Sequence, residues 1–140
     1  MTRDTEITDL RDQTARLCFI GAGNMASAII GGLCSRHYPA DRLQVCAPDG
    51  GQLDALRARF GVTTSLDNTA FLDHCDVLLL CVKPQMMEAV CAALARHLDG
   101  RRIAIVSVAA GVSIASLRQW LGRGHPIVRC MPNTPALVQQ

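Results

Sequence analysis

Residues 17–26 read LCFIGAGNMA, and this stretch decides the fold expected for the chain. Its first four residues are apolar and predict a short buried strand, and the residues from Asn24 onward follow a helical period. Between them lies a G-x-G-x-x-A pattern. Gly21 permits a tight turn, Gly23 leaves the backbone open to a phosphate, and Ala26 lets the helix pack on the strand. The stretch therefore predicts a strand, a glycine turn and a helix whose amino end binds a pyrophosphate.

The rest of the chain repeats this alternation of short apolar runs and longer segments of helical period. Strands are predicted at residues 17–20, 43–47, 62–64, 76–82, 103–108 and 126–131. Helices are predicted at residues 24–37, 52–60, 85–98 and 113–121, with a short one around residues 67–73. The expected buried stripe of the helix over residues 85–98 is Met86, Val90, Leu94 and Leu98. Apolar strands separated by helices predict an α/β fold of the Rossmann type, a doubly wound, mainly parallel sheet with helices on both faces.

Composition narrows the class of protein. The 140 residues are 49% apolar and 19% charged, with a net charge of +2. This charge is too small to indicate a nucleic-acid or anionic-membrane partner. Residues 1–16 lack the apolar run of a signal peptide, and the longest apolar run, residues 77–82, is far shorter than the roughly 20 residues of a membrane helix. We expect a cytoplasmic protein with a polar tail over residues 1–15 and one domain over residues 16–140.

The seven cysteines form no disulfide framework. They are scattered, odd in number and contain no C-x-x-C pair. Four of them lie in apolar runs, where a free thiol behaves as a small hydrophobic group: Cys18, Cys46, Cys81 and Cys130. The four histidines show no ligand spacing. We therefore expect buried free thiols in a reducing compartment and no metal site.

Two charged residues follow predicted strands, at the sheet edge where such folds bind ligands. Asp49 follows the second strand, where an acid binds the ribose hydroxyls of NAD and an arginine accepts the 2′-phosphate of NADP. In Pro-Asp-Gly-Gly it is equally a turn former, so the choice between NADP and NAD stays open. Lys83, the only lysine, is either beside the ligand or a solvated surface residue. Pro84 suits the first turn of the next helix.

Small residues mark further close contacts. Gly31 and Gly32 lie inside the first helix, where each costs about 1 kcal/mol relative to alanine, so another group is expected to approach that face. The predicted fifth strand ends in the small residues 108–111, which leave room for a flat ring against the backbone. Ser113 is the predicted N-cap of the last helix.

Four stretches resemble the pyrroline-5-carboxylate reductase family: FIGAGNMASAIIGG, LCVKPQ, SVAAGV and RCMPNTPALV, in that family's order and at similar spacings. The resemblance runs from about Arg16 to the end of the chain, and its last three motifs are the more specific. It implies reduction of 1-pyrroline-5-carboxylate to L-proline with NADP or NAD. The cofactor contacts that it implies are Ile20, Gly21, Ala22, Gly23, Asn24, Met25, Pro48, Asn68, Cys81, Val82, Lys83, Pro84, Val108, Ala109 and Ala110.

The resemblance also sets an expectation about the other half of the enzyme. Family members continue past the Pro-Asn-Thr-Pro loop into a helical domain that forms the oligomer and closes over the imine acid. We expect that domain to be absent from these residues, with Asn133 and Thr134 bordering the substrate. No catalytic residue or proton donor is identified. The alternatives are another NAD(P)-dependent dehydrogenase, of the hydroxy-acid type, and an inactive nucleotide-binding fragment.

Overall fold

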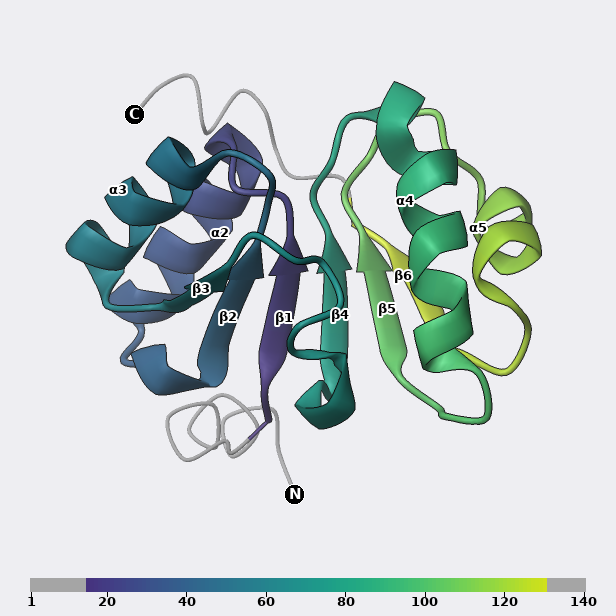
Figure 1. Ribbon diagram of the computed structural model, residues 1–140, viewed down its shortest axis with the longest axis horizontal. Helices are drawn as coiled ribbons and strands as arrows, with labels where there is room; N and C mark the ends of the chain where they lie inside the picture. Colours follow the sequence, from purple (N-terminus) through teal and green to yellow (C-terminus); the bar gives the residue numbers. More distant parts are fainter. Residues whose placement is uncertain (1–14, 131–140) are drawn as a thin grey trace.

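Six parallel strands form the centre of the molecule. The computed structural model describes residues 15–130. The strands lie in the order β3-β2-β1-β4-β5-β6 (Figure 1). Their bounds are β1 Leu17–Ile20, β2 Leu43–Cys46, β3 Thr63–Ser65, β4 Val77–Leu80, β5 Ala104–Ser107 and β6 Ile127–Arg129. The chain builds outward from β1 to β3, then returns beside β1 with β4 and builds the other way. The predicted Rossmann-type sheet is confirmed.

Helices cover both faces of this sheet. They are α2 Asn24–Ser35, α3 Gly50–Phe60, α4 Pro84–Leu98 and α5 Ile114–Leu121, with single 3-10 turns η2 Ala40–Arg42 and η3 Leu72–His74. The first two lie against one face and the other two against the opposite face (Figure 1). The predicted tail over residues 1–15, except Ala15, and the predicted substrate residues Asn133 and Thr134 lie outside the described residues.

Strand β1 explains why the apolar runs show no alternation. Cys18 and Ile20 belong to the core under α4 and α5, whereas Phe19 belongs to the core under α2 and α3. All three side chains are fully buried. A strand covered on both faces needs apolar residues at every position, so continuous runs such as LCFI and VLLL become the central strands.

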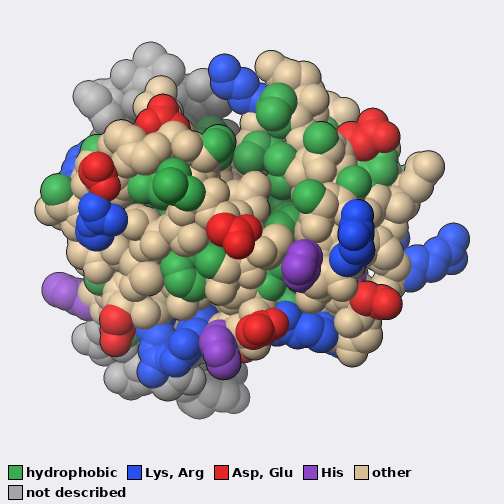
Figure 2. Space-filling model, viewed as in Figure 1, with side chains coloured by type: hydrophobic (Ala, Val, Ile, Leu, Met, Phe, Trp, Pro, Cys, Tyr) green, Lys and Arg blue, Asp and Glu red, His purple; other side chains and the backbone are tan. Residues whose placement is uncertain are grey.

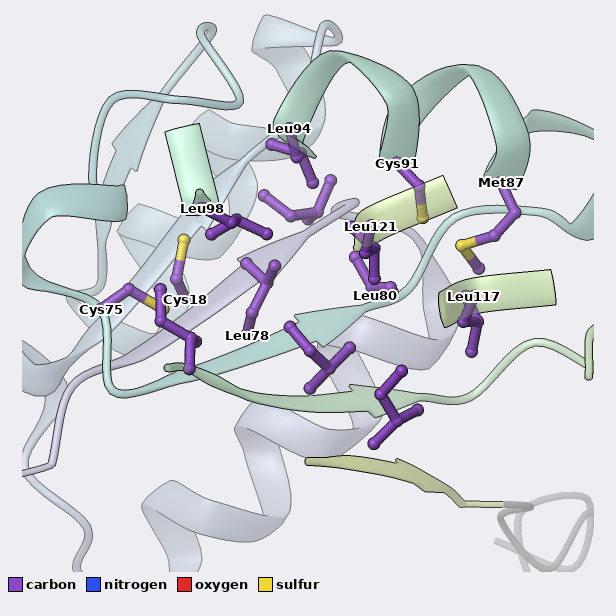
Figure 3. Close-up of a cluster of buried hydrophobic side chains, with 14 of the residues drawn as sticks. Cys18, Cys75, Leu78, Leu80, Met87, Cys91, Leu94, Leu98, Leu117 and Leu121 are labelled. Carbon is purple, nitrogen blue, oxygen red and sulfur yellow. The ribbon is translucent and has the colours of Figure 1, made fainter. Parts of the chain in front are cut away.

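The buried face of α4 differs from the predicted stripe. The fully buried positions are Met87, Cys91, Leu94 and Leu98, which point toward the sheet and α5 (Figure 3). Met86 is 51% exposed, and Val90 is only partly buried. A strict four-residue repeat turns about 40° further at each step, because a helix advances about 100° per residue. The core is therefore reached by mixed steps of three and four, which begin at Met87.

The short helix predicted around residues 67–73 is wrong. Turns precede the 3-10 turn η3, which begins only at Leu72. The Asp67 carboxylate accepts hydrogen bonds from the Thr69 N–H at 2.9 Å and the Thr69 hydroxyl at 2.8 Å. The Ser65 hydroxyl accepts one from the Asp67 N–H. Such side-chain bonds to nearby backbone compete with helix formation, and they hold this segment as a loop.

Small differences at helix ends have equally local causes. Helix α2 ends at Ser35, before His37, whose φ of 70° is not helical. Helix α3 starts two residues earlier than predicted, since Asp49 caps it. The expected close approach to α2 occurs at Gly31, where an added Cβ would lie 3.4 Å from the Phe60 ring. Gly32 has no neighbour within 4 Å.

The seven cysteines are free, as predicted. Four of them are buried, namely Cys18, Cys46, Cys75 and Cys91, and Cys34 and Cys81 are partly buried. Cys130 is exposed, because edge strand β6 has a partner on one side only. Within residues 15–130 no cluster of three metal-ligating side chains occurs. None of the described helices has the length and hydropathy needed to cross a membrane.

The corrected face of α4 predicts opposite effects for two adjacent methionines. Met87→Ala should lower the free energy of unfolding by about 2–5 kcal/mol, the usual cost of a cavity in a core. Met86→Ala should change it by less than about 0.5 kcal/mol, as for other exposed positions. Urea denaturation of both variants measures the difference. A larger loss for Met86→Ala would show that the original stripe was right.

Candidate functional site

A cavity of about 610 Å³ lies at the carboxyl edge of the sheet. It opens where the strand order reverses between β1 and β4, the position at which open α/β sheets bind ligands. Its volume is that of a small-molecule site. It is lined by Ile20, Gly21, Ala22, Gly23, Ala47, Pro48, Asp49, Gln52, Leu66, Asp67, Asn68, Thr69, Cys81, Val82, Lys83, Met86, Val90 and Ala93.

Gly21 is required by the protein chain itself. Its φ is +111°, and an added Cβ would lie 2.6 Å from the Cys81 carbonyl oxygen. The Gly21 N–H donates to the Cys46 carbonyl at 2.8 Å, and the Cys81 N–H donates to the Ile20 carbonyl at 2.8 Å. The ends of β1, β2 and β4 are thereby tied together. A larger residue at position 21 would push these strand ends apart.

Gly23 is different, because no residue in the described part of the chain requires a glycine there. Its backbone is extended, with φ −83° and ψ −160°, and an added Cβ would have no neighbour within 4 Å. The position borders the cavity and precedes α2 as its N-cap. No described side chain caps α2, and its first turn holds no acid. A glycine that leaves space beside free N–H donors fits a phosphate group.

Asn68 supplies a second sign of a ligand. Its Oδ1 atom is buried at the cavity and has no hydrogen-bond partner among the described residues. An unpaired buried polar atom costs about 1–3 kcal/mol. A ligand with a polar group in this part of the cavity would remove that cost. Asn68 was predicted from the family resemblance and not from its local pattern.

The end of β4 brings a thiol and an ammonium group to the cavity. Lys83 is exposed and is the N-cap of α4, with Pro84 in the first turn as predicted. Among the described residues that line the cavity, Lys83 carries the only positive charge. Burial raises the pKa of Cys81 to about 12. The thiol therefore stays protonated near neutral pH and is a packing group there, without the thiolate that a nucleophile needs.

Asp49 has features of both roles considered from the sequence, a turn residue and an acid at the ligand edge. Its carboxylate Oδ1 accepts a hydrogen bond from the Gln52 N–H at 3.1 Å and so caps α3. The residue also lines the cavity. The turn residue predicted from Pro-Asp-Gly-Gly is thus a helix cap that remains at the ligand edge.

The structure brings together nine of the predicted cofactor residues on the cavity wall: Ile20, Gly21, Ala22, Gly23, Pro48, Asn68, Cys81, Val82 and Lys83. Six do not line it, namely Asn24, Met25, Pro84, Val108, Ala109 and Ala110. Asn24 borders a neighbouring hollow. Val108 and Ala109 are nearly buried at the end of β5, whose Val108 N–H donates to the Leu80 carbonyl. Cofactor contacts for all fifteen remain predictions.

Sequence reasoning missed the apolar side of the cavity. Leu66, after β3, is 64% exposed, and Met86 is 51% exposed, yet both line it. Hydrophobic side chains reach the surface on the α4 side of this face, among charges of both signs (Figure 2). The predicted stripe places Met86 and Val90 in the core because they are apolar and lie on a helix. The sequence did contain a signal for the correct face. Met87, Cys91, Leu94 and Leu98 are also apolar, and their mixed steps of four and three follow a helix face more closely than a strict step of four.

Substitution of the two glycines of the turn should have different effects on the stability of the chain. Gly21→Ala should destabilise the chain by at least about 1–3 kcal/mol, the cost of a strained backbone position, before the clash with Cys81 is counted. Gly23→Ala should change stability by less than about 0.5 kcal/mol, since the added methyl group has free space. Thermal and urea unfolding of the ligand-free variants test this. Equal losses would mean that Gly23 also serves the fold.

The chain is similar to known proteins over about half of their length. The chain is 46% identical over 127 residues to the pyrroline-5-carboxylate reductase of Pseudomonas aeruginosa, covering 91% of this chain and 46% of that protein. The solved structure of a pyrroline-5-carboxylate reductase from Coxiella burnetii superimposes with a TM-score of 0.86 at 38% identity, over 91% of this chain and 47% of the other. That of Plasmodium falciparum pyrroline carboxylate reductase with NADP bound gives 0.73 at 26% identity, over 91% and 45%.

The chain thus spans about half the length of the curated relatives that it matches. Residues 16–111 match the family described as "NADP oxidoreductase coenzyme F420-dependent". The chain belongs to that family of oxidoreductases.

Proposed function

We propose that this chain is the cofactor-binding half of a pyrroline-5-carboxylate reductase, which reduces 1-pyrroline-5-carboxylate to L-proline with NADPH or NADH. The observation that carries the proposal is the open space at Gly23, beside the uncapped start of α2 and at the reversal of the strand order. The relatives in Pseudomonas aeruginosa and Coxiella burnetii support this choice of reaction, since they share 46% and 38% of the aligned residues. The NADP bound to the Plasmodium falciparum structure supports the choice of cofactor.

The residues present fit a nicotinamide dinucleotide. The turn at Gly21 and Gly23 and the first N–H groups of α2 would hold its pyrophosphate. Lys83 would add a positive charge from the start of α4. Bound in this way, the cofactor supplies a hydride for the C=N carbon of the substrate. Leu66 and Met86, which are exposed on the apolar wall, would be covered by the bound cofactor, and the water displaced there would strengthen polar contacts inside the cavity.

Residues 16–140 form the nucleotide-binding domain in this proposal, and a second, helical domain supplies most of the substrate site and the oligomer interface. The share of the relatives that the chain spans, about half, supports this division. Asn133 and Thr134 would border the imine acid. Hydride transfer also needs a proton for the imine nitrogen, and the described residues offer no donor that we assign. The reaction is placed in the cytoplasm, in keeping with the free thiols.

Dinucleotide binding is the direct test of the glycine turn. Gly23→Val should abolish detectable binding of NADPH and NADH to the chain, because the side chain fills the space of the pyrophosphate. Gly32→Ala is the matched control in the same helix, since its added methyl group also meets nothing within 4 Å. Isothermal titration calorimetry measures the affinities. Unchanged binding by Gly23→Val would leave the glycine turn without a ligand role.

The reductase activity is tested by a chimera. Residues 1–140 are joined to the second half of the Pseudomonas aeruginosa relative, and oxidation of NADPH is followed in the presence of 1-pyrroline-5-carboxylate. The chimera should show substrate-dependent oxidation, whereas residues 1–140 alone should show little, because the substrate surface is incomplete. A folded chimera that binds NADPH and reduces no imine would refute the proposed reaction.

A further inference from the structure

A second hollow adjoins the cavity, between α2 and α3. Its volume is about 170 Å³. It shares Ala22, Gly23 and Gln52 with the wall of the larger cavity, so the two spaces meet beside the glycine turn. The proposed contacts of the pyrophosphate account for the side of this hollow at Gly23 and Asn24 and leave its α3 side without a role.

The lining of the hollow is chemically suited to an anion. Arg59, on α3, is the one ionisable side chain among the described residues that line it. Asn24 and Ser27 of α2 and Gln52 of α3 add an amide, a hydroxyl and a second amide. A guanidinium group with neutral donors around it is a common way to bind a phosphate. No described carboxylate lines the hollow to compete for Arg59.

Arg59 is exposed in the last turn of α3, and its guanidinium contacts the ring of the next residue, Phe60. Its Cζ atom lies 4.9 Å from the centroid of the Phe60 ring, a cation–π contact. The Phe60 ring in turn lies against Gly31 of α2, where an added Cβ would approach it to 3.4 Å. Side chains of a helix also lean toward its amino end, which for Arg59 is the end at Gln52 and the cavity. Gly31 therefore helps to set the position of a charge as well as the spacing of two helices.

Its neighbour Arg57 is already paired with residues of β3 and α3. Its guanidinium donates to the Thr64 hydroxyl at 2.8 Å and forms an ion pair with Asp54. Asp49, the acid at the end of β2, has one carboxylate oxygen committed to capping α3 and does not line the hollow. Arg59 is thus the basic residue of α3 that remains available to a ligand at the joined cavities.

We propose that this hollow takes the 2′-phosphate of NADPH and that Arg59 makes the chain prefer NADPH to NADH. The inference rests on the proposed function, since it concerns the same cofactor. The 2′-phosphate is the chemical difference between the two cofactors, and it lies on the adenosine ribose, which Rossmann-type folds bind beyond the end of β2. Gln52, common to both spaces, lies next to that strand end, so a phosphate on the ribose has a short path into the hollow.

The test compares NADPH and NADH affinities of the 140-residue chain by calorimetry, in wild type, Arg59→Gln and Arg57→Gln. Arg59→Gln should weaken NADPH about ten- to hundredfold, the loss expected for charge-assisted hydrogen bonds. NADH should bind as before, within about twofold, and Arg57→Gln should leave both affinities within the same range of wild type. The wild-type preference for NADPH should also shrink as salt is added.

A third variant distinguishes the effect of Arg59 from that of Asp49, the acid at the end of β2. Asp49→Asn keeps an oxygen for the helix cap, and the preference for NADPH should survive it. A wild type that binds both cofactors equally, or an Arg59→Gln variant that loses both equally or neither, would overturn the role of Arg59 and leave the proposed reductase intact. A wild type that binds neither cofactor would overturn the proposed function together with this inference.

Discussion

The close contact between Gly21 and the Cys81 carbonyl is the constraint on which the site depends. It lets the turn after β1 lie directly against the end of β4, and backbone hydrogen bonds join the end of β1 to the ends of both β2 and β4. The chain can then leave β1 on one face and leave β4 on the other. The cavity opens at this divergence, so a single position without a side chain ties the topology of the sheet to the place of the ligand.

The two helices that begin at the cavity lack the stabilising side-chain caps that the other two helices have. Asp49 and Ser113 cap α3 and α5 with side-chain hydrogen bonds. Helices α2 and α4 have no such cap among the described residues, and both begin on the cavity wall at Gly23 and Lys83. A missing cap costs about 1 kcal/mol. The free N–H groups that result are the donors that an anionic ligand needs, so the cost and the binding capacity have the same origin.

Much of the fold was predictable because its signals are local. The apolar runs that became β1 and β4 and the glycine turn between β1 and α2 need no distant partner to be recognised. The failures arose where two local preferences competed. Met86 and Met87 are equally apolar, and only the packing of α4 on the sheet distinguishes them. Residues 67–73 contain the apolar run 70–72, which fits a short helix, yet the Asp67 side chain holds the start of the segment in turns.

The sequence by itself determined the alternation of strands and helices, the glycine turn, the capping residues and a set of ligand contacts near the strand ends, since each depends on residues close together in the chain. Tertiary structure alone decided the rest. It placed exposed Leu66 and Met86 on one cavity wall, left Asn68 Oδ1 unpaired and put Arg59 in a hollow beside Gly23. These relations join different elements, and their distances follow from how helices pack across the sheet, which no short stretch of sequence encodes.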